Sequence, residues 1–369
     1  MAGQHRHRRG RRRFRLSDVP LRWRAVLGTG FPAVPRKSPD VRLTMTTRDR
    51  PTIGYLPAFA DDAFTAAIRA VPAARLVVLS DADLVERHAE QLDGLVCGGN
   101  HNSYSRAVAQ VLRARARRLR WIQVTSAGFD ALQENGIPEA VVATGNGGAF
   151  NVPVAEHAMA LLLALARGIV PALASDGGRW NKDRVLPGLR PMEGASLAVV
   201  GLGGIGRAVA ARANAFDMKV TGITRSGRPV EGVADVRPMT GLADALGESD
   251  AVVVCLPLTD QTRGLIDAAL LSRMKRGALL VNVGRGAVVD TDALCAALNA
   301  GQIGGAGLDV VHPEPLPDAH PLWAAPNCIV TPHIAPAGSD LAIRRIADVI
   351  TANVGRFARG EALLHPIRI

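Results

Sequence analysis

Short apolar runs alternate with amphipathic stretches in the first part of the chain. The amphipathic stretches Ala63–Ala70 and Arg106–Arg118 predict helices. Strands are predicted at Thr52–Tyr55, Leu76–Leu79, Gly94–Val96, Trp121–Val124 and Ala140–Ala143. Strands that alternate with helices are typical of a parallel sheet with helices on its faces. This pattern predicts a first, smaller α/β domain.

The same alternation resumes at Ser196, after a long apolar helix predicted at Val152–Arg167 with Asn151 as its N-cap. A Gly/Pro-rich stretch, Asp176–Glu193, is predicted to be a loop. Strands are predicted at Leu197–Val200, Lys219–Ile223, Ala251–Leu256, Ala278–Val283, Gly307–Val311 and Cys328–Thr331. Six strands in this rhythm fit a sheet made of two mononucleotide-binding halves.

A last amphipathic helix, Leu341–Arg359, is predicted to return to the first domain. We therefore expect an α/β protein with two Rossmann-like, doubly wound parallel-sheet domains and an active site in the cleft between them. The smaller domain is predicted to span residues 49–150 plus 338–369, and the larger one residues 151–337.

The formal net charge of +11 is concentrated near the start of the chain. Residues 1–44 hold 12 Lys and Arg against two acidic residues, whereas the other 325 residues hold 32 basic and 31 acidic side chains. Residues 1–48 are predicted to form a disordered basic tail. It could grip phosphates, act as a targeting peptide, or be absent from the native protein if translation starts at Met45. Because the rest is neutral, nucleic-acid binding is not expected.

The apolar content of 48% is ordinary for a globular protein, and no apolar run approaches the ~20 residues of a membrane span. The four cysteines, at positions 97, 255, 295 and 328, form no C-x-x-C pair. We therefore expect neither a metal site nor a disulfide framework, and a cytoplasmic location.

A glycine-rich turn follows the predicted strand Leu197–Val200 and precedes a predicted helix, Arg207–Phe216. In this setting the pattern G-x-G-x-x-G indicates dinucleotide binding, because glycines permit the turn, the approach to a pyrophosphate and close helix packing. The helix N-terminus offers N–H groups to the anion. The predicted contacts are Gly201, Gly203, Gly204, Ile205 and Gly206.

The end of the second strand indicates which nucleotide is bound. About twenty residues after the glycines the chain reads Thr224-Arg225-Ser226, without a carboxylate. An acid there would bind the ribose 2′-hydroxyl, whereas an arginine suits a 2′-phosphate. We therefore expect a preference for NADP(H), with NAD(H) possible.

Three side chains at predicted strand ends suit hydride transfer to a 2-keto acid. Arg285 can hold a carboxylate and polarise a ketone, His333 can donate or accept a proton, and Glu314 can tune the imidazole. Ligands of open α/β sheets bind at the carboxyl ends of the strands, where all three are expected.

Seven motifs in order make the chain similar to the D-isomer-specific 2-hydroxyacid dehydrogenases, the family that includes glyoxylate/hydroxypyruvate reductase. They are WIQVTSAGFD (121–130), VAEHAMALLLALAR (154–167), GLGGIG (201–206), LPLTDQTRGLI (256–266), NVGRGAVVDTDAL (282–294), AGLDVVHPEPLP (306–317) and TPHIA (331–335).

The resemblance implies roles for several residues. Arg285 would bind the substrate carboxylate and carbonyl, His333 would be the acid/base, and Glu314 would raise its pKa. Asp309 would orient the nicotinamide carboxamide, while Gly98, Gly99 and Asn100 would contact the substrate. The cofactor groove would include Leu256, Pro257, Thr262 and Val283.

The expected function is an NADP(H)-preferring reductase of small 2-keto acids such as glyoxylate or hydroxypyruvate. Two alternatives remain: an NAD(H)-dependent enzyme like phosphoglycerate dehydrogenase, and a cofactor-sensing interaction protein like the co-repressors of the family. The resemblance also implies a homodimer. Thr224, where NAD-using relatives carry an acid, and the sequence IAPAGS after His333 depart from the family pattern.

Overall fold

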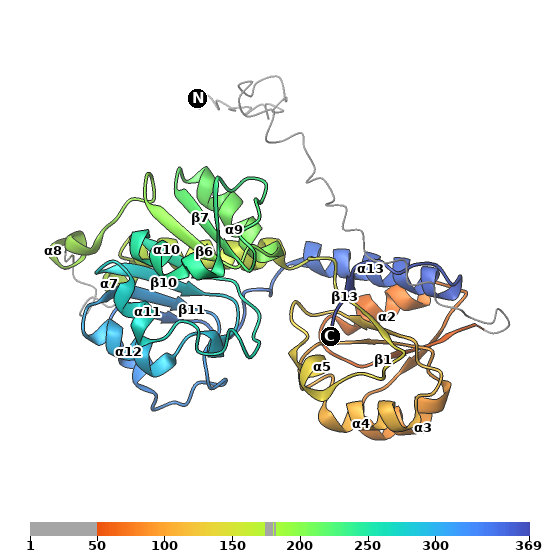
Figure 1. Ribbon diagram of the computed structural model, residues 1–369. Coiled ribbons are helices and arrows are strands. Elements are labelled where there is room, and N and C mark those ends of the chain that lie inside the picture. The colour runs from red at the N-terminus through yellow and green to blue at the C-terminus, as the bar shows by residue number, and fades with distance from the viewer. Residues whose placement is uncertain (1–49, 174–179, 181) are drawn as a thin grey trace, which may run out of the picture. The chain divides into compact units, whose positions relative to one another are not determined.

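The computed structural model describes residues 50–173, 180 and 182–369, so the predicted basic tail lies outside the described residues. Two β-sheets with helices on their faces make up the described chain (Figure 1). Both are mostly parallel, which confirms the predicted α/β class with two doubly wound domains.

The first sheet has the strand order β13-β5-β4-β3-β1-β2. Its strands are β1 (Thr52–Tyr55), β2 (Arg75–Val78), β3 (Gly94–Cys97), β4 (Trp121–Val124), β5 (Val142–Thr144) and β13 (Pro366–Ile367). All neighbours pair in parallel except β13, which is antiparallel to β5. The order reverses between β1 and β3, and ligands of doubly wound sheets bind beyond the strand ends at such a point.

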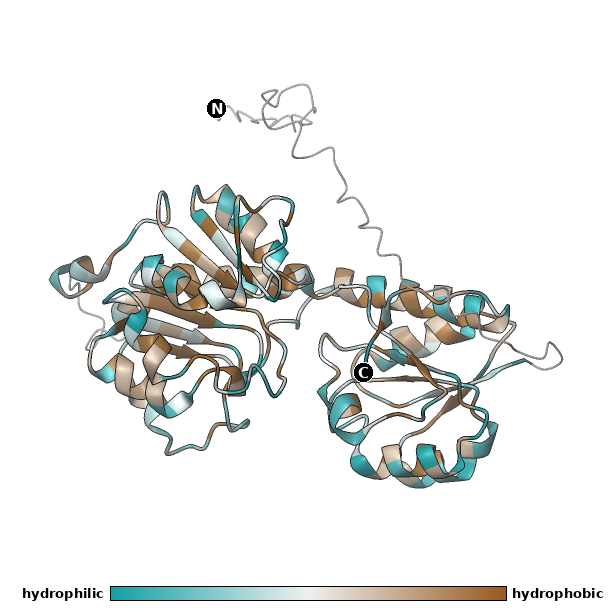
Figure 2. Ribbon diagram, viewed as in Figure 1, coloured by the Kyte–Doolittle hydropathy of each residue, from teal (hydrophilic) through white to brown (hydrophobic). Residues whose placement is uncertain are grey.

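Helices cover both faces of the first sheet. One face carries α2 (Asp61–Arg69) and α13 (Asp340–Ala358), and the other carries α3 (Ala82–His88), α4 (Arg106–Arg115) and α5 (Asp130–Asn135) (Figure 1). Hydroxyl or carboxylate oxygens of Asp81, Ser105 and Ser339 cap three of these helices. In Figure 2 the strands are mostly brown, whereas α3 and α4 carry teal residues, as expected for helices with one apolar face.

The second sheet has seven parallel strands in the order β12-β11-β10-β9-β6-β7-β8. They are β6 (Ser196–Val200), β7 (Lys219–Thr224), β8 (Asp235–Pro238), β9 (Ala251–Val254), β10 (Ala278–Asn282), β11 (Ile303–Leu308) and β12 (Cys328–Val330). The strands β6, β9 and β10 are buried and apolar apart from the partly buried Ser196 and the buried Asn282, as in sheets covered on both faces. All strands run in one direction, so their carboxyl ends lie along one edge.

Two helical layers bury the second sheet. The apolar helix α6 (Asn151–Ala166) and α9 (Gly204–Ala215) contribute to one core cluster, and α10 (Leu242–Glu248), α11 (Ala268–Arg273) and α12 (Thr291–Asn299) to another. Two short helices, α7 (Ile169–Leu173) and α8 (Lys182–Val185), follow α6. None of the helices in the described chain has the length and apolarity to cross a membrane.

Most predicted strands differ from the observed ones by one or two residues, but one strand was misplaced, two were missed, and two other predictions were wrong. The strand expected at Gly307–Val311 is β11, Ile303–Leu308. Its early glycines obscure the strand pattern; a side chain on Gly305 would strike Asn327. The short edge strands β8 and β13 were not predicted. Asn151 does not cap α6; it is the first helical residue, after Phe150. Within the predicted loop Asp176–Glu193, residues 182–185 form α8.

A buried polar network ties α13 to the first sheet. The Oε1 atom of Gln123 accepts hydrogen bonds from Thr144 and Asn353, both at 2.9 Å. Asn353 also pairs with the backbone of Leu364 through both of its amide atoms, at 3.1 and 2.7 Å. None of these three polar side chains is exposed, so their hydrogen bonds to one another replace the bonds to water that burial removes. The network positions the segment that ends in β13.

Candidate active site

The glycine-rich turn joins β6 to α9. Gly201 has φ 100°, a conformation that favours glycine, and its Cβ would lie 3.0 Å from the carbonyl oxygen of Cys255. A Cβ on Gly206 would overlap the carbonyl of Gly201. In contrast, a Cβ on Gly203 would meet no atom of the described chain within 4 Å. Gly203 therefore borders open space at the start of α9.

The start of α9 is suited to an anion. Gly204 and Ile205 are its first residues, and no side chain of the described chain caps it. The first N–H groups of a helix have no acceptor within the helix and carry a partial positive charge. Together with the open space at Gly203, this arrangement fits a dinucleotide pyrophosphate.

The end of β7 has no carboxylate among residues 224–228. The Thr224 hydroxyl accepts a hydrogen bond from the N–H of Gly227 at 2.9 Å and so closes a tight turn. Arg225 and Ser226 follow and are exposed. A guanidinium and a hydroxyl are thus accessible beside the strand end.

The other residues expected in the cofactor groove follow strands of the same sheet. Leu256 and Pro257 come after β9, and the Thr262 hydroxyl closes their loop by donating to the carbonyl of Pro257 at 2.7 Å. Val283 follows β10 and is buried. The structure thus brings these residues and the glycine turn to the carboxyl edge of the second sheet.

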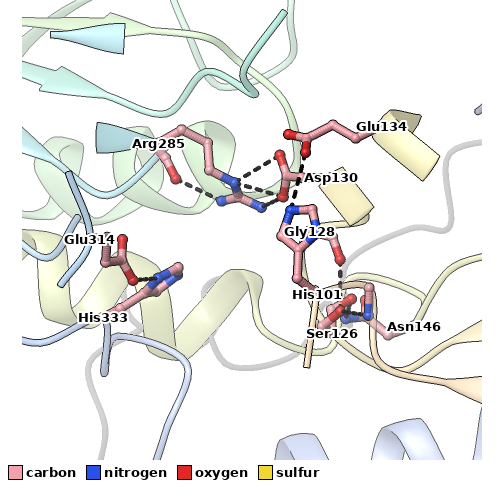
Figure 3. A network of polar contacts seen from close by, with 11 residues as sticks. His101, Ser126, Gly128, Asp130, Glu134, Asn146, Arg285, Glu314 and His333 are labelled. Carbon is pink, nitrogen blue, oxygen red and sulfur yellow. Dashed lines mark hydrogen bonds and ion pairs between the residues drawn. The ribbon is translucent and has the colours of Figure 1, made fainter. Parts of the chain in front are cut away.

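His333 and Glu314 are in direct contact. Nδ1 of His333 lies 2.7 Å from Oε1 of Glu314 (Figure 3), and the two side chains are 41% and 45% exposed. The hydrogen bond to Glu314 raises the pKa of His333; partial burial opposes this effect, and the negative charge of Glu314 adds to it. The nearby Arg285 charge lowers this pKa and Asp309 raises it. The net effect is a pKa of His333 above its ordinary value.

Asp309 is a buried carboxylate that organises the turn carrying His333. One of its oxygens accepts from the hydroxyl of Thr331 at 2.8 Å and the N–H of Ile334 at 2.9 Å, and the other accepts from the N–H of Ala335 at 3.0 Å. His157 extends the network to Thr331 at 2.9 Å. His333 itself has φ 54°, an unusual conformation for a non-glycine residue.

Arg285 follows β10 and is held by Asp130, a residue not singled out from the sequence. Nε of Arg285 lies 3.1 and 3.0 Å from the two carboxylate oxygens of Asp130, and Nη2 lies 2.8 Å from one of them (Figure 3). Nη1 donates to the carbonyl of Gly284 at 2.7 Å. A Cβ on Gly128 would overlap Nη2, so a larger residue there would displace the guanidinium.

Gly98, Gly99 and Asn100 follow β3. The N–H of Gly98 donates to the hydroxyl of Ser103 at 2.9 Å, and that of Gly99 donates to the hydroxyl of Ser126 at 2.7 Å. The glycine amides expected to bind a carboxylate thus already have side-chain acceptors. These two serines were not predicted, because serines 5 and 27 residues away give no local signal.

A cavity of about 620 Å³ brings these groups together. Its polar part includes Arg285, His333 and Asp130 together with Gly98, Gly99 and Asn100. Its apolar part includes Phe59, Phe150, Pro336 and Ile343. Phe59 and Phe150 are in contact, with ring centroids 5.8 Å apart. Glu314 does not line the cavity and is connected to it through its hydrogen bond with His333. A small acid could meet a cation and an imidazolium at one end and apolar surface at the other.

Comparison with known proteins identifies the family. The family model described as D-isomer specific 2-hydroxyacid dehydrogenase, NAD binding domain, matches residues 159–335. A glyoxylate reductase of Thermofilum pendens is 39% identical over 262 residues, which are 69% of this chain and 76% of the relative. A glycerate dehydrogenase of Methylorubrum extorquens is 41% identical over 224 residues, 58% of this chain and 67% of the relative.

Solved structures of similar proteins belong to the same family. A D-isomer specific 2-hydroxyacid dehydrogenase family protein from Aeromonas salmonicida is 30% identical, covering 87% of this chain and 99% of its own, with a TM-score of 0.74. A D-isomer specific 2-hydroxyacid dehydrogenase from Xanthobacter autotrophicus, solved with NADPH and MES, is 29% identical over 87% of this chain and 98% of its own, with a TM-score of 0.71. This chain belongs to the D-isomer specific 2-hydroxyacid dehydrogenase family, NAD(P)-dependent oxidoreductases that act on a CH–OH group.

Proposed function

We propose that this protein is an NADP(H)-preferring reductase of small 2-keto acids such as glyoxylate or hydroxypyruvate. The observation that carries the proposal is a cavity lined by both Arg285 and His333, in which His333 is hydrogen-bonded to Glu314. The similar glyoxylate reductase and glycerate dehydrogenase act on acids of this class by name.

In the proposed reaction, Arg285 binds the carboxylate of the acid and polarises its ketone. A bound NADPH supplies the hydride. The imidazolium of His333 gives its proton to the developing alkoxide, and Glu314 stabilises the charged ring beforehand. In the direction of oxidation, neutral His333 takes the proton from the hydroxyl. Asp309 fixes the turn on which His333 lies and, as proposed from the resemblance, orients the nicotinamide carboxamide.

The choice of NADP(H) rests on the end of β7. Arg225 and Ser226 are exposed donors there, and the Thr224 hydroxyl is engaged in the turn. A 2′-phosphate would gain a guanidinium partner, whereas a ribose 2′-hydroxyl would lack the usual carboxylate. The Xanthobacter protein, which was solved with NADPH, offers a precedent within the family.

An unphosphorylated acid is favoured over a phosphorylated one. Among the side chains that line the described cavity, Arg285 is the only arginine or lysine. It would be needed for the carboxylate, so a phosphate would have no second strong cation. This argues against the alternative of an enzyme like phosphoglycerate dehydrogenase.

We assign substrate binding to residues 49–150 plus 338–369 and cofactor binding to residues 151–337. We also propose a homodimer in a reducing compartment such as the cytoplasm. Leu173 and Trp180, near α7 and α8, are 80% and 95% exposed, and burying such side chains in a partner would stabilise a dimer. Sedimentation velocity tests this: the wild type should be dimeric, and Leu173→Glu should shift it toward monomer.

The function is tested by steady-state kinetics with NADPH and NADH against glyoxylate, hydroxypyruvate and other 2-keto acids. Turnover with a higher kcat/KM for NADPH is expected. His333→Ala should lose turnover while still binding NADPH. If the wild type prefers NADH, the cofactor proposal is wrong. If it binds NADPH but reduces none of the acids, the cofactor-sensing alternative gains support.

A further inference from the structure

The guanidinium of Arg285 is bound on two sides by the protein itself. Asp130 accepts hydrogen bonds from Nε and Nη2, which form one side edge of the guanidinium, and the carbonyl of Gly284 accepts one from Nη1. A guanidinium has five N–H groups. One N–H of Nη1 and one of Nη2 therefore have no acceptor in the described chain, and they form the outer end of the fork.

The backbone of Arg285 is also held in place. The side-chain amide of Asn282, which is 1% exposed, donates to the carbonyl of Arg285 at 3.0 Å and accepts from the N–H of Gly284 at 3.0 Å. The remaining freedom of Arg285 lies in its long side chain. Asp130 restricts this freedom with three contacts of 2.8–3.1 Å, against a single bond to the carbonyl of Gly284.

The environment makes this ion pair effective. The side chains of Arg285 and Asp130 are only 24% and 29% exposed, so solvent screens them less than a surface pair. Asp130 begins α5, where the helix end favours a negative charge. Gly128 leaves no room beyond Nη2 for a side chain, so the guanidinium fits closely between Gly128 and Asp130.

We propose that Asp130 is a positioning residue that orients Arg285 so that the outer end of its fork, rather than its side edge, meets the substrate carboxylate. This inference rests on the proposed function. Asp130 and a bound carboxylate would use different N–H groups of Arg285, so both can be held at once. Two parallel N–H groups suit a bidentate carboxylate. Asp130 thereby sets where the acid lies relative to His333.

The alternative, in which Asp130 competes with the substrate for Arg285, predicts the opposite kinetic effect of removing Asp130. If Asp130 occupied the place of the substrate carboxylate, its removal would make Arg285 more available, and KM for the keto acid would fall. If Asp130 positions Arg285, its removal loosens the guanidinium, and kcat falls because geometry matters most in the transition state.

The test compares Asp130→Asn and Asp130→Glu with Glu134→Gln. Glu134 lies on the same helix and forms an exposed pair with His101, 3.2 Å apart, so its variant is a matched control. Thermal unfolding confirms that each variant is folded. Asp130→Asn should lower kcat about tenfold to a hundredfold, Asp130→Glu should recover part of it, and Glu134→Gln should resemble the wild type.

A second readout does not depend on turnover. Phenylglyoxal reacts with arginine, and peptide mass spectrometry gives the modification rate of Arg285. Asp130→Asn should accelerate it several-fold, and Glu134→Gln should not. Unchanged kcat and reactivity, or a fall in KM at unchanged kcat, would overturn the inference. A wild type without turnover but with faster modification in Asp130→Asn would instead count against the proposed function alone.

Discussion

One carboxylate oxygen of Asp309 accepts the N–H of Ala335 at 3.0 Å, two residues beyond His333. The other oxygen accepts from Thr331 and Ile334, so the chain on both sides of the histidine is bound to a single side chain. This explains how His333 keeps its φ of 54°. The position of the imidazole therefore depends on a carboxylate that is 2% exposed.

Asp309→Asn should destabilise the protein and slow the reduction of the keto acid. The asparagine side chain has only one oxygen to accept hydrogen bonds. If this oxygen replaces the one that binds Thr331 and Ile334, the NH₂ group faces the N–H of Ala335, and both are buried donors without an acceptor. We expect the free energy of unfolding to fall by about 1–3 kcal/mol, with a lower kcat as His333 moves. Urea denaturation and initial rates measure both effects. Asp292→Asn, on an exposed turn of α12, is the control; equal stability of the two variants would contradict this prediction.

Glu314→Gln should change the pH profile of keto acid reduction. Reduction needs protonated His333, and Glu314 raises the pKa of this ring, so the wild type keeps its activity to a pH above 6.5. Without the carboxylate the pKa falls, because partial burial and the Arg285 charge then prevail. The alkaline limb of kcat/KM should move to lower pH, with the largest loss at pH 8 and little at pH 5.5. An unmoved limb would show that Glu314 does not tune the histidine.

Arg225→Ala should change the cofactor preference. Losing a charged hydrogen bond to the 2′-phosphate should lower kcat/KM for NADPH about tenfold to a hundredfold, while NADH use stays the same. Arg276→Ala removes the same charge before β10, at the amino end of the sheet, and serves as the control. An equal loss of kcat/KM with both cofactors would mean that Arg225 does not bind the 2′-phosphate.

Gly203→Ala and Gly206→Ala should fail in different ways. A methyl group on Gly203 meets no described atom within 4 Å, so this variant should fold normally but bind NADPH weakly, because the methyl enters the space for the pyrophosphate. A methyl group on Gly206 would overlap the Gly201 carbonyl, so this variant should lose thermal stability as well. Calorimetry and NADPH fluorescence titration separate the effects. Identical behaviour of the two variants would exclude this division of roles.

Local patterns were enough for most of the fold. Buried parallel strands such as β9 are continuous apolar runs, and the loop glycines after β6 mark a turn, so both could be predicted from neighbouring residues. The strand β11 was misplaced because its early glycines serve contacts with other elements, such as Asn327 against Gly305. The strand β13 has two residues and no periodicity to recognise.

The site was less accessible to sequence reasoning. His333 and Glu314 were expected to act together, and the structure brings them to 2.7 Å. The Asp130 contact joins residues 155 positions apart. Asp130 closes the motif at residues 121–130, but nothing in the sequence connects it with Arg285. The hydroxyls that occupy the Gly98 and Gly99 amides were equally hidden. Contacts of this kind depend on tertiary geometry.

The pairing of β13 with β5 also has a consequence for the order in which the protein forms during translation. The strands of the second sheet all lie within residues 196–330 and emerge from the ribosome as one continuous stretch. The first sheet begins at Thr52 but gains its edge strand, and the helix α13 over its core, only with residues 340–367. The part made first is thus completed last. Until α13 has been made, we expect the apolar face that it covers to be exposed and open to chaperone binding.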